Sequence, residues 1–205
     1  MKKIRLNYII SLVSILLFIT IAIFIVKKES LVIDEFGYNL VSKFISEFRT
    51  PTVKFITNFG SAKILIPMAS IIMIILVIRK KRKDALLLGC NLLLVTIINM
   101  VVKNIFKRAR PTILPLIEQG GYSFPSGHTM ATTAFYGYLI YLVYKNIENK
   151  YLKWFLIVLL SMIIFLIGSS RIYLGVHYTS DVLAGFLLSL SYLIIFISFT
   201  NKKVE

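Results

Sequence analysis

Six long apolar segments limit what this chain can fold into. They cover residues 8–26, 62–78, 85–102, 129–144, 154–168 and 182–199. A bilayer core about 30 Å thick needs about 20 helical residues, so the shortest segments require flanking residues or a covering of protein at their ends. Hydrophobic residues make up 58% of the 205 positions and charged residues 16%, which excludes an ordinary soluble domain. The sequence predicts an all-α integral membrane protein, a bundle of six transmembrane helices.

The first apolar segment follows a basic start, as in a signal peptide. Its apolar stretch is long, however, and no small-x-small cleavage pattern precedes Lys27. We therefore expect a retained membrane anchor.

The net charge of +15 raises the question of nucleic-acid binding. Because the basic residues lie in short runs between apolar segments, nucleic acid is not an expected partner. Six spans place 13 basic residues on the face of the termini and 11 on the other, and those 13 lie in much shorter segments. The positive-inside rule then predicts a multi-pass protein of the cell membrane with cytoplasmic N- and C-termini.

The connection after the first span contains an expected amphipathic helix over residues 34–49. Apolar side chains recur there every four residues, at Phe36, Leu40, Phe44 and Phe48. Two interpretations stay open: a helix lying in the headgroup plane on the extracytoplasmic side, or a packed helix that only closes the bundle. Thr50-Pro51 is expected to end this helix.

Polar residues gather in three clusters, which six spans would place at the extracytoplasmic face. These are "KNIFKRARP" (103–111), "YSFPSGHT" (122–129) and "SSRIYLGVHYTSD" (169–181). On a continuous helix, Lys103, Lys107 and Arg110 would form one basic stripe. Basic residues that flank a membrane helix would explain such a stripe. The extracytoplasmic face should be poor in basic residues, however, so cations there indicate an anionic ligand.

The second cluster has the pattern of a helix start, with Ser126 as the N-cap. Gly127 leaves the backbone open to close approach, and free N–H groups at a helix N-terminus favour phosphate. His128, in the first turn, is then placed to donate a proton. Taken alone, the stretch Pro125-Ser126-Gly127-His128 indicates only a capped helix.

The third cluster pairs His177 with Asp181 at an i, i+4 spacing. On a helix, the carboxylate would hold one imidazole nitrogen and leave the other nucleophilic. Arg171 is expected on a short glycine-containing turn, where its planar fork suits a phosphate. The alternative is a His–Asp pair at a membrane surface whose only role is the hydrogen bond between its two side chains. Ionisable groups at such a place are, however, usually functional.

Together these residues predict metal-free phosphoryl transfer. Two histidines, a carboxylate and several cations are present, without an acidic cluster able to hold two divalent metals. One histidine would attack the phosphorus in line and the other would protonate the leaving oxygen. We expect neither a metal nor another cofactor.

The three clusters resemble the motifs of the type 2 phosphatidic acid phosphatase superfamily, which includes vanadium haloperoxidases and bacterial acid phosphatases. K-x6-R-P, P-S-G-H and S-R-x5-H-x3-D are all matched in order and spacing. The resemblance covers the last four spans well and the first 60 residues loosely. It implies a phosphatidic acid phosphatase/haloperoxidase-like core at 61–205, preceded at 1–60 by the anchor and the amphipathic helix.

The resemblance also implies roles for individual residues. His177 would form a phosphohistidine, Asp181 would orient it, and His128 would be the general acid. The phosphate would be bound by Lys103, Arg110, Ser126, Gly127 and Arg171, with Ser170 as a supporting motif position. Lys107, Arg108 and Tyr122 are not motif positions, and the resemblance assigns them no role at the headgroup.

The layout looks like the bacterial membrane-bound branch, similar to phosphatidylglycerophosphatase type B and undecaprenyl-diphosphatase. The expected substrate is a lipid phosphate: phosphatidylglycerol phosphate, phosphatidic acid or a polyprenyl diphosphate. A lipid phosphotransferase and a non-enzymatic protein that binds or transports anionic lipids stay as alternatives, whereas six spans argue against a haloperoxidase. No obligatory protein partner is evident from the sequence.

Overall fold

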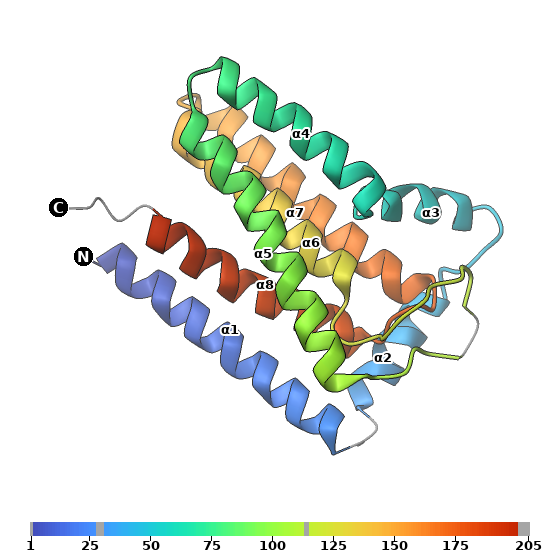
Figure 1. The fold of residues 1–205 in the computed structure, drawn as a ribbon. Coiled ribbons are helices and arrows are strands. Elements are labelled where there is room, and N and C mark those ends of the chain that lie inside the picture. The colour runs from blue at the N-terminus through green and yellow to red at the C-terminus, as the bar shows by residue number, and fades with distance from the viewer. Residues whose placement is uncertain (1, 28–30, 113–114, 201–205) are drawn as a thin grey trace.

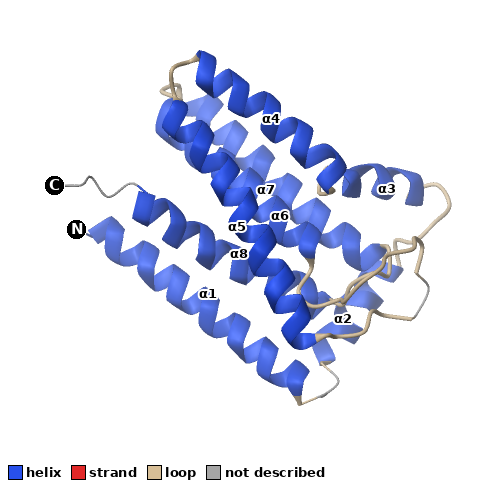
Figure 2. Ribbon diagram, in the orientation of Figure 1, coloured by secondary structure: helices blue, strands red, loops and turns tan. Residues whose placement is uncertain are grey.

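The chain is all-helical in the part that the computed structural model describes. Residues 2–27, 31–112 and 115–200 are described, and no strand occurs among them (Figure 2). The helices are α1 (Lys2–Val26), α2 (Val32–Ser42), α3 (Thr50–Asn58), α4 (Ala62–Ile78), α5 (Arg82–Phe106), α6 (Gly127–Asn146), α7 (Lys150–Tyr173) and α8 (Thr179–Thr200). All six apolar segments of the sequence lie within helices, which confirms the all-α prediction.

Helix α6 occupies the centre of the bundle. It packs against α5, α7 and α8, while α1 lies along α8 and α4 along α5 (Figure 1). Helix α1 begins and α8 ends at the same end of the bundle (Figure 1). The short helices α2 and α3 lie at the opposite end, together with the described parts of the connection between α5 and α6, 107–112 and 115–126 (Figure 1). This second end carries the polar clusters.

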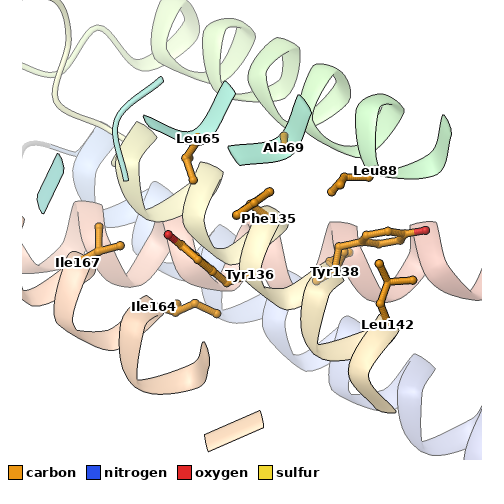
Figure 3. Packing of buried hydrophobic residues seen from close by; sticks show 10 residues of the cluster. Leu65, Ala69, Leu88, Phe135, Tyr136, Tyr138, Leu142, Ile164 and Ile167 are labelled. Atoms are coloured by element: carbon orange, nitrogen blue, oxygen red, sulfur yellow. The ribbon is translucent and has the colours of Figure 1, made fainter. Parts of the chain in front are cut away.

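The main core forms where α4, α5, α7 and α8 meet α6. Its buried side chains include Leu65, Leu88, Phe135, Tyr138 and Ile167 (Figure 3). Burying large apolar side chains of this kind stabilises a fold by about 1.5–3 kcal/mol each in water. In a bilayer this gain is smaller, and close packing and hydrogen bonds between helices matter more.

Polar side chains also join the helices inside the bundle. Ser11 of α1 and Ser191 of α8 lie 2.8 Å apart between their hydroxyl oxygens. The fully buried side-chain amide of Asn91 in α5 donates to the Ala134 carbonyl of α6 at 2.8 Å. Hydrogen bonds of this type hold apolar helices in register.

Within the part of the chain that the structure describes, four helices are long and apolar enough to cross a membrane: α1 over Leu6–Val26, α5, α7 and α8. Helices α3 and α4 meet at a 45° bend and together form a possible fifth span. Helix α6 is not among them, because it carries many polar residues and faces protein rather than lipid. The chain is a multi-pass membrane protein, and the count of six spans stays a prediction.

The amphipathic segment differs from its prediction. Helix α2 ends at Ser42 rather than at Thr50, and Thr50-Pro51 begins α3 instead of ending a helix. A proline fits the first turn of a helix because its missing N–H needs no partner there. Phe36, Leu40, Phe44 and Phe48, predicted to form one apolar face, are all largely exposed.

Helix α2 approaches the start of α8 closely at Gly37. A Cβ at this position would overlap the side chain of Thr179. Beyond Gly37, Val41 and Ile45 pack against a buried group at the end of α7, formed by Tyr173, Leu174 and Val176. These contacts hold α2 over the end of the bundle that carries the candidate site.

Candidate active site

The ends of four long helices meet at one end of the bundle and bring the three polar clusters together. Lys103 lies in the last turn of α5, His128 in the first turn of α6, Arg171 in the last turn of α7, and Asp181 in the first turn of α8. Burial and the nearby charges of Arg171, Arg110 and Lys103 lower the pKa of His128 to about 3, so these cations lie close to His128. The structure therefore places all the predicted catalytic side chains in one site.

His177 is buried, and its two ring nitrogens face different groups. Its Nδ1 lies 3.4 Å from Oδ2 of Asp181, and its Nε2 lies 3.2 Å from NH1 of Arg110. The carboxylate acceptor assigns the proton to Nδ1, which leaves a lone pair on Nε2. The prediction of a pair on one helix was wrong in detail, because His177 precedes α8; the turn into the helix still brings the two side chains together.

Burial controls the charge of His177. Burial, with smaller contributions from Arg110 and Arg171, lowers the pKa of His177 to about 4 against the opposing effect of Asp181. The imidazole is therefore neutral at pH 7, the form in which a ring nitrogen can act as a nucleophile.

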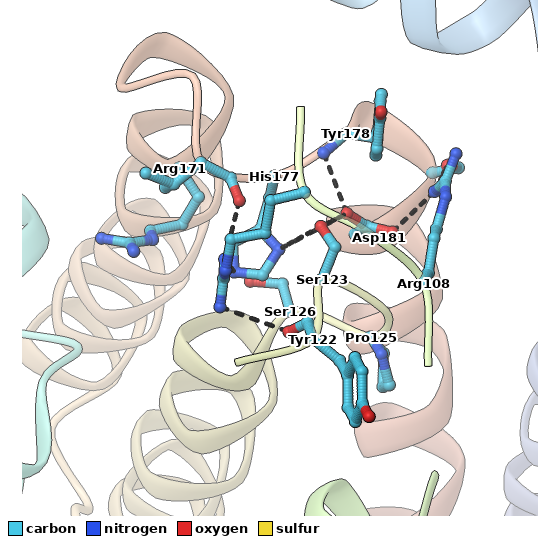
Figure 4. Close-up of polar contacts among 12 residues, drawn as sticks. Arg108, Tyr122, Ser123, Pro125, Ser126, Arg171, His177, Tyr178 and Asp181 are labelled. Atoms are coloured by element: carbon cyan, nitrogen blue, oxygen red, sulfur yellow. Dashed lines mark hydrogen bonds and ion pairs between the residues drawn. The ribbon is translucent and has the colours of Figure 1, made fainter. Parts of the chain in front are cut away.

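Both carboxylate oxygens of the fully buried Asp181 are engaged. Oδ2 accepts hydrogen bonds from the Ser123 hydroxyl at 2.5 Å and from the Tyr178 backbone N–H at 2.9 Å. Oδ1 accepts from NH1 of Arg108 at 2.6 Å. Figure 4 shows Asp181 between His177 and Arg108. A carboxylate with this many donors at a helix N-terminus stays ionised and fixed in orientation.

Ser123 is a site residue that the sequence analysis missed. It is fully buried, and its hydroxyl lies 3.3 Å from Nδ1 of His177 as well as contacting Asp181. Its backbone N–H donates to the Arg108 carbonyl at 2.8 Å, which fixes the 107–126 connection at this point. The residue precedes the cis Phe124–Pro125 peptide. No pattern in the sequence distinguishes this serine from others in a loop.

Lys103 and Arg110 do not share a helix, so the predicted basic stripe is wrong. Helix α5 ends at Phe106, and Lys107 has a left-handed backbone with a φ of 45° that turns the chain away. The two cations nevertheless converge on the Tyr122 carbonyl, Nζ of Lys103 at 2.5 Å and NH2 of Arg110 at 3.2 Å. Turning the chain after α5 is what brings Arg110 beside His177.

Arg171 lies on the final turn of α7, not on the glycine-containing turn expected from the sequence. Only 1% of it is exposed. Its NH1 donates to the Thr57 hydroxyl at 2.9 Å and its NH2 to the Gln119 side-chain oxygen at 2.8 Å. Its Nε is buried and has no acceptor among the described residues. An anion in the site would supply the missing acceptor, and neither Thr57 nor Gln119 was foreseen.

The start of α6 agrees in part with its prediction. Ser126 is the N-cap, and its hydroxyl accepts from the backbone N–H of Thr129 at 3.5 Å and from the Thr129 hydroxyl at 3.0 Å. A Cβ at Gly127 would lie 3.0 Å from the side-chain oxygen of Asn99. Capping occupies the Ser126 side chain, so phosphate binding by Ser126 and Gly127 stays a prediction.

The three positions outside the motifs separate in the structure. Lys107 and Tyr122 have exposed side chains, whereas Arg108 turns inward to two carboxylates. In the described ranges, no three His, Cys, Asp or Glu side chains gather closely enough to hold a metal ion. The expectation of a metal-free reaction stays a prediction.

A buried imidazole backed by a carboxylate and facing arginines, at the end of a membrane bundle, is the arrangement that phosphoryl transfer requires. Comparison with known proteins defines the family. The PAP2 superfamily model matches residues 84–205, more than half of the chain. The protein therefore belongs to the PAP2 superfamily, as its motifs indicated, and is a phosphatase of that family.

Two relatives and one solved structure show the range of similarity. Phosphatidylglycerophosphatase B of Bacillus subtilis is 35% identical over 137 residues, which cover 66% of this chain and 67% of the relative. Undecaprenyl-diphosphatase of Sulfolobus acidocaldarius is 28% identical over 161 residues, covering 74% and 72%. The crystal structure of a transmembrane PAP2-type phosphatidylglycerolphosphate phosphatase from Bacillus subtilis superposes with a TM-score of 0.80 at 27% identity, covering 94% of this chain and 98% of that one.

Proposed function

We propose that the protein hydrolyses the terminal phosphate of a membrane lipid through a phosphohistidine intermediate. The observation that carries the proposal is the placement of His177, with Asp181 at Nδ1 and Arg110 at Nε2. This arrangement leaves one neutral nitrogen facing a cationic site, as in-line attack on phosphorus requires.

In the first step, the Nε2 lone pair attacks phosphorus and forms the N–P bond while the bond to the leaving oxygen breaks. A bound phosphate anion offsets the cations that lower the pKa of His128, so that His128 is protonated in the complex and gives this proton to the leaving oxygen. Lys103, Arg110 and Arg171 neutralise the equatorial oxygens as negative charge accumulates, and Asp181 stabilises the positive charge on His177. In the second step, His128 takes a proton from water as the water oxygen bonds to phosphorus, and the N–P bond breaks, which releases inorganic phosphate and returns the electron pair to Nε2 of His177.

The substrate class follows from where the site lies. Its groups stand at the ends of apolar helices. If these helices span a bilayer, their ends lie where a lipid headgroup meets water. Phosphatidylglycerol phosphate, phosphatidic acid and undecaprenyl diphosphate each carry a terminal phosphate at this level. The names of the two relatives favour the first and the third as the lipids to test.

We place this site on the extracytoplasmic face of a six-span protein with both termini in the cytoplasm. Helix α1 begins and α8 ends at the opposite end of the bundle from the site, as this arrangement requires (Figure 1). The exposed Phe36 and Leu40 support α2 as an interfacial helix that lies against the headgroups. The division into an N-terminal part at 1–60 and a catalytic core at 61–205 is part of the same proposal, although Asp34 and Thr57 reach the site from the first part.

The test is phosphate release from the three lipids in detergent, by the wild-type protein and by a His177→Ala variant. We expect release from at least one lipid by the wild type, insensitivity to EDTA, and no turnover by the variant. Size-exclusion elution and melting temperature would show that His177→Ala is folded. Turnover by purified His177→Ala, or complete inhibition by EDTA that added metal reverses, contradicts the proposal.

The same assay separates the alternatives. Transfer of phosphate to an added lipid alcohol, in preference to water, would identify a phosphotransferase, because an alcohol can also attack a phosphohistidine. Saturable lipid binding without release from any of the three lipids would favour a binding or transport protein.

A further inference from the structure

Arg108 makes an ion-pair bridge in the site that none of the three motifs contains. Its NH1 lies 2.6 Å from Oδ1 of Asp181, and its NH2 lies 2.8 Å from Oδ2 of Asp34 in the first turn of α2. The guanidinium carbon stands 4.0 Å from the centre of the Tyr178 ring. With 17% of its side chain exposed, Arg108 is held on three sides by α2, α8 and the turn before α8.

Asp34 does more than balance the charge of Arg108. Its Oδ1 accepts from the Ser180 backbone N–H at 2.7 Å, and its Oδ2 accepts from the Ser180 hydroxyl at 3.0 Å. Ser180 lies in the first turn of α8, where backbone N–H groups have no partner in their own helix. Asp34 therefore caps α8 from another helix, and α2 is bound to the turn that carries Asp181.

Arg108 lies on the side of Asp181 away from the proposed phosphate position. In Figure 4, His177 and Arg171 lie on one side of Asp181 and Arg108 on the other. Its two NH groups already contact two carboxylates, unlike Arg171, whose Nε has no acceptor among the described residues. Arg108 is thus engaged by protein anions and directed away from the phosphate.

The bridge fixes the rotation of the Asp181 carboxylate. With Oδ1 held by Arg108, Oδ2 is directed to Ser123, to the Tyr178 N–H and to His177. The planar fork of arginine directs one NH group to each carboxylate in a fixed geometry, which the compact ammonium of a lysine on its flexible stem does not reproduce. Loss of the fork would let the carboxylate rotate and would leave a buried anion without its partner.

On the basis of the function proposed above, we propose that Arg108 is a positioning residue for the phosphatase reaction, which holds Asp181 against His177 and ties it to α2 through Asp34. Arg108 would then affect the chemical step and not the binding of substrate. The same contact makes the placement of α2 part of the catalytic geometry.

The test compares kcat and KM for dioctanoyl phosphatidic acid, or for whichever of the three lipids the wild type hydrolyses best, in detergent. Arg108→Gln should lower kcat roughly 10- to 100-fold, the size expected for losing a hydrogen bond to a buried charge, with KM within about twofold. Arg108→Lys should recover part of the loss, and Asp34→Asn should lower kcat less than Arg108→Gln does. Arg49→Gln is the matched control, since Arg49 is exposed between α2 and α3 with its guanidinium near the Phe44 ring, and it should match the wild type.

Two results would overturn the inference: a wild-type kcat in Arg108→Gln, or a raised KM with unchanged kcat, which would make Arg108 a substrate ligand. If Arg108→Gln fails to fold, Arg108→Lys and Asp34→Asn give the same comparison. His177→Ala keeps the two proposals apart. An inactive His177→Ala beside a fully active Arg108→Gln removes only the present inference, whereas an active His177→Ala removes the proposed function.

Discussion

NH1 of Arg110 lies 3.2 Å from Nε2 of His177, the ring nitrogen that Asp181 does not hold. The same guanidinium donates to the Val176 carbonyl at 2.7 Å and to the Gly120 carbonyl at 2.9 Å. These contacts place a fixed positive charge beside the proposed nucleophile. Phosphate oxygens bound there would lie next to the attacking atom.

From this contact we expect Arg110→Lys to lower kcat by about 10²–10³-fold, as seen when a donor to developing charge is removed. A lysine keeps the charge but loses the planar fork. Single-turnover phosphate release, compared with release at saturating substrate, would show whether formation of the intermediate is the slowed step. A kcat within twofold of the wild type would contradict this role.

Ser123→Ala should lower kcat by about tenfold, because Asp181 loses a hydrogen bond to a buried charge. The protein should remain folded, since the serine hydroxyl is small and its backbone contact with Arg108 is kept. Ser70→Ala is the matched control: the Ser70 hydroxyl donates to the Ile66 carbonyl of its own helix, far from the motifs in sequence. Equal activity of the two variants would show that Ser123 does not support Asp181.

Gly60 leaves the space in which His128 and α7 approach the turn before α4. A Cβ there would lie 2.6 Å from Cγ2 of Ile167 and 3.2 Å from Cδ2 of His128. Gly60→Ala should therefore cost about 1–3 kcal/mol of stability, the usual range for overpacking, and should reduce activity by displacing His128.

Melting temperature and phosphate release in detergent would measure both effects. Gly89→Ala is the control, because a Cβ at Gly89 meets only the flexible Met73 sulfur at 3.4 Å. If Gly60→Ala and Gly89→Ala have the same melting temperature and the same rate of phosphate release, the packing argument fails.

The depressed pKa of His177 predicts a dependence of stability on pH. Folded, the residue stays neutral down to about pH 4, whereas the unfolded chain binds a proton near the usual histidine pKa of about 6.5. Because the unfolded state binds more protons between these values, stability falls as the pH drops from about 7 to about 4, by at most about 3 kcal/mol from this residue.

Melting temperatures of the wild type and of His177→Gln, measured between pH 4.5 and pH 7 in the same detergent, isolate this contribution. The variant should lose less stability than the wild type as the pH falls. Parallel curves would show that His177 titrates with an ordinary pKa in the folded protein.

Local sequence patterns were sufficient to predict the six long helices and the motif residues of the candidate site. Apolar length and periodicity located the six long helices, because burial in lipid or in a core demands a continuous apolar stretch. The cap at Ser126 followed from local hydrogen-bonding chemistry. The spacing of the three motifs identified the family, which the comparisons confirmed.

Breaks between helices were less predictable. Nothing local required α2 to end at Ser42, or α5 to end at Phe106 with Lys107 in a left-handed turn. The contacts of Gly37 and Val41 with α8 and the end of α7 decide where α2 lies. Such contacts join residues more than a hundred positions apart, and their strength does not appear in any short window of sequence.

The sequence by itself determined that this is a helical membrane protein of the PAP2 superfamily, and it named the histidines, the carboxylate and the cations of the candidate site. Only the tertiary structure decided which group each side chain contacts. Arg108 turns to Asp34 and Asp181, and Ser123 joins the same carboxylate, because the chain leaves α5 in a turn and α2 lies over the start of α8. Residue type and spacing specify a side chain's chemistry, but its partners depend on the packing of distant helices.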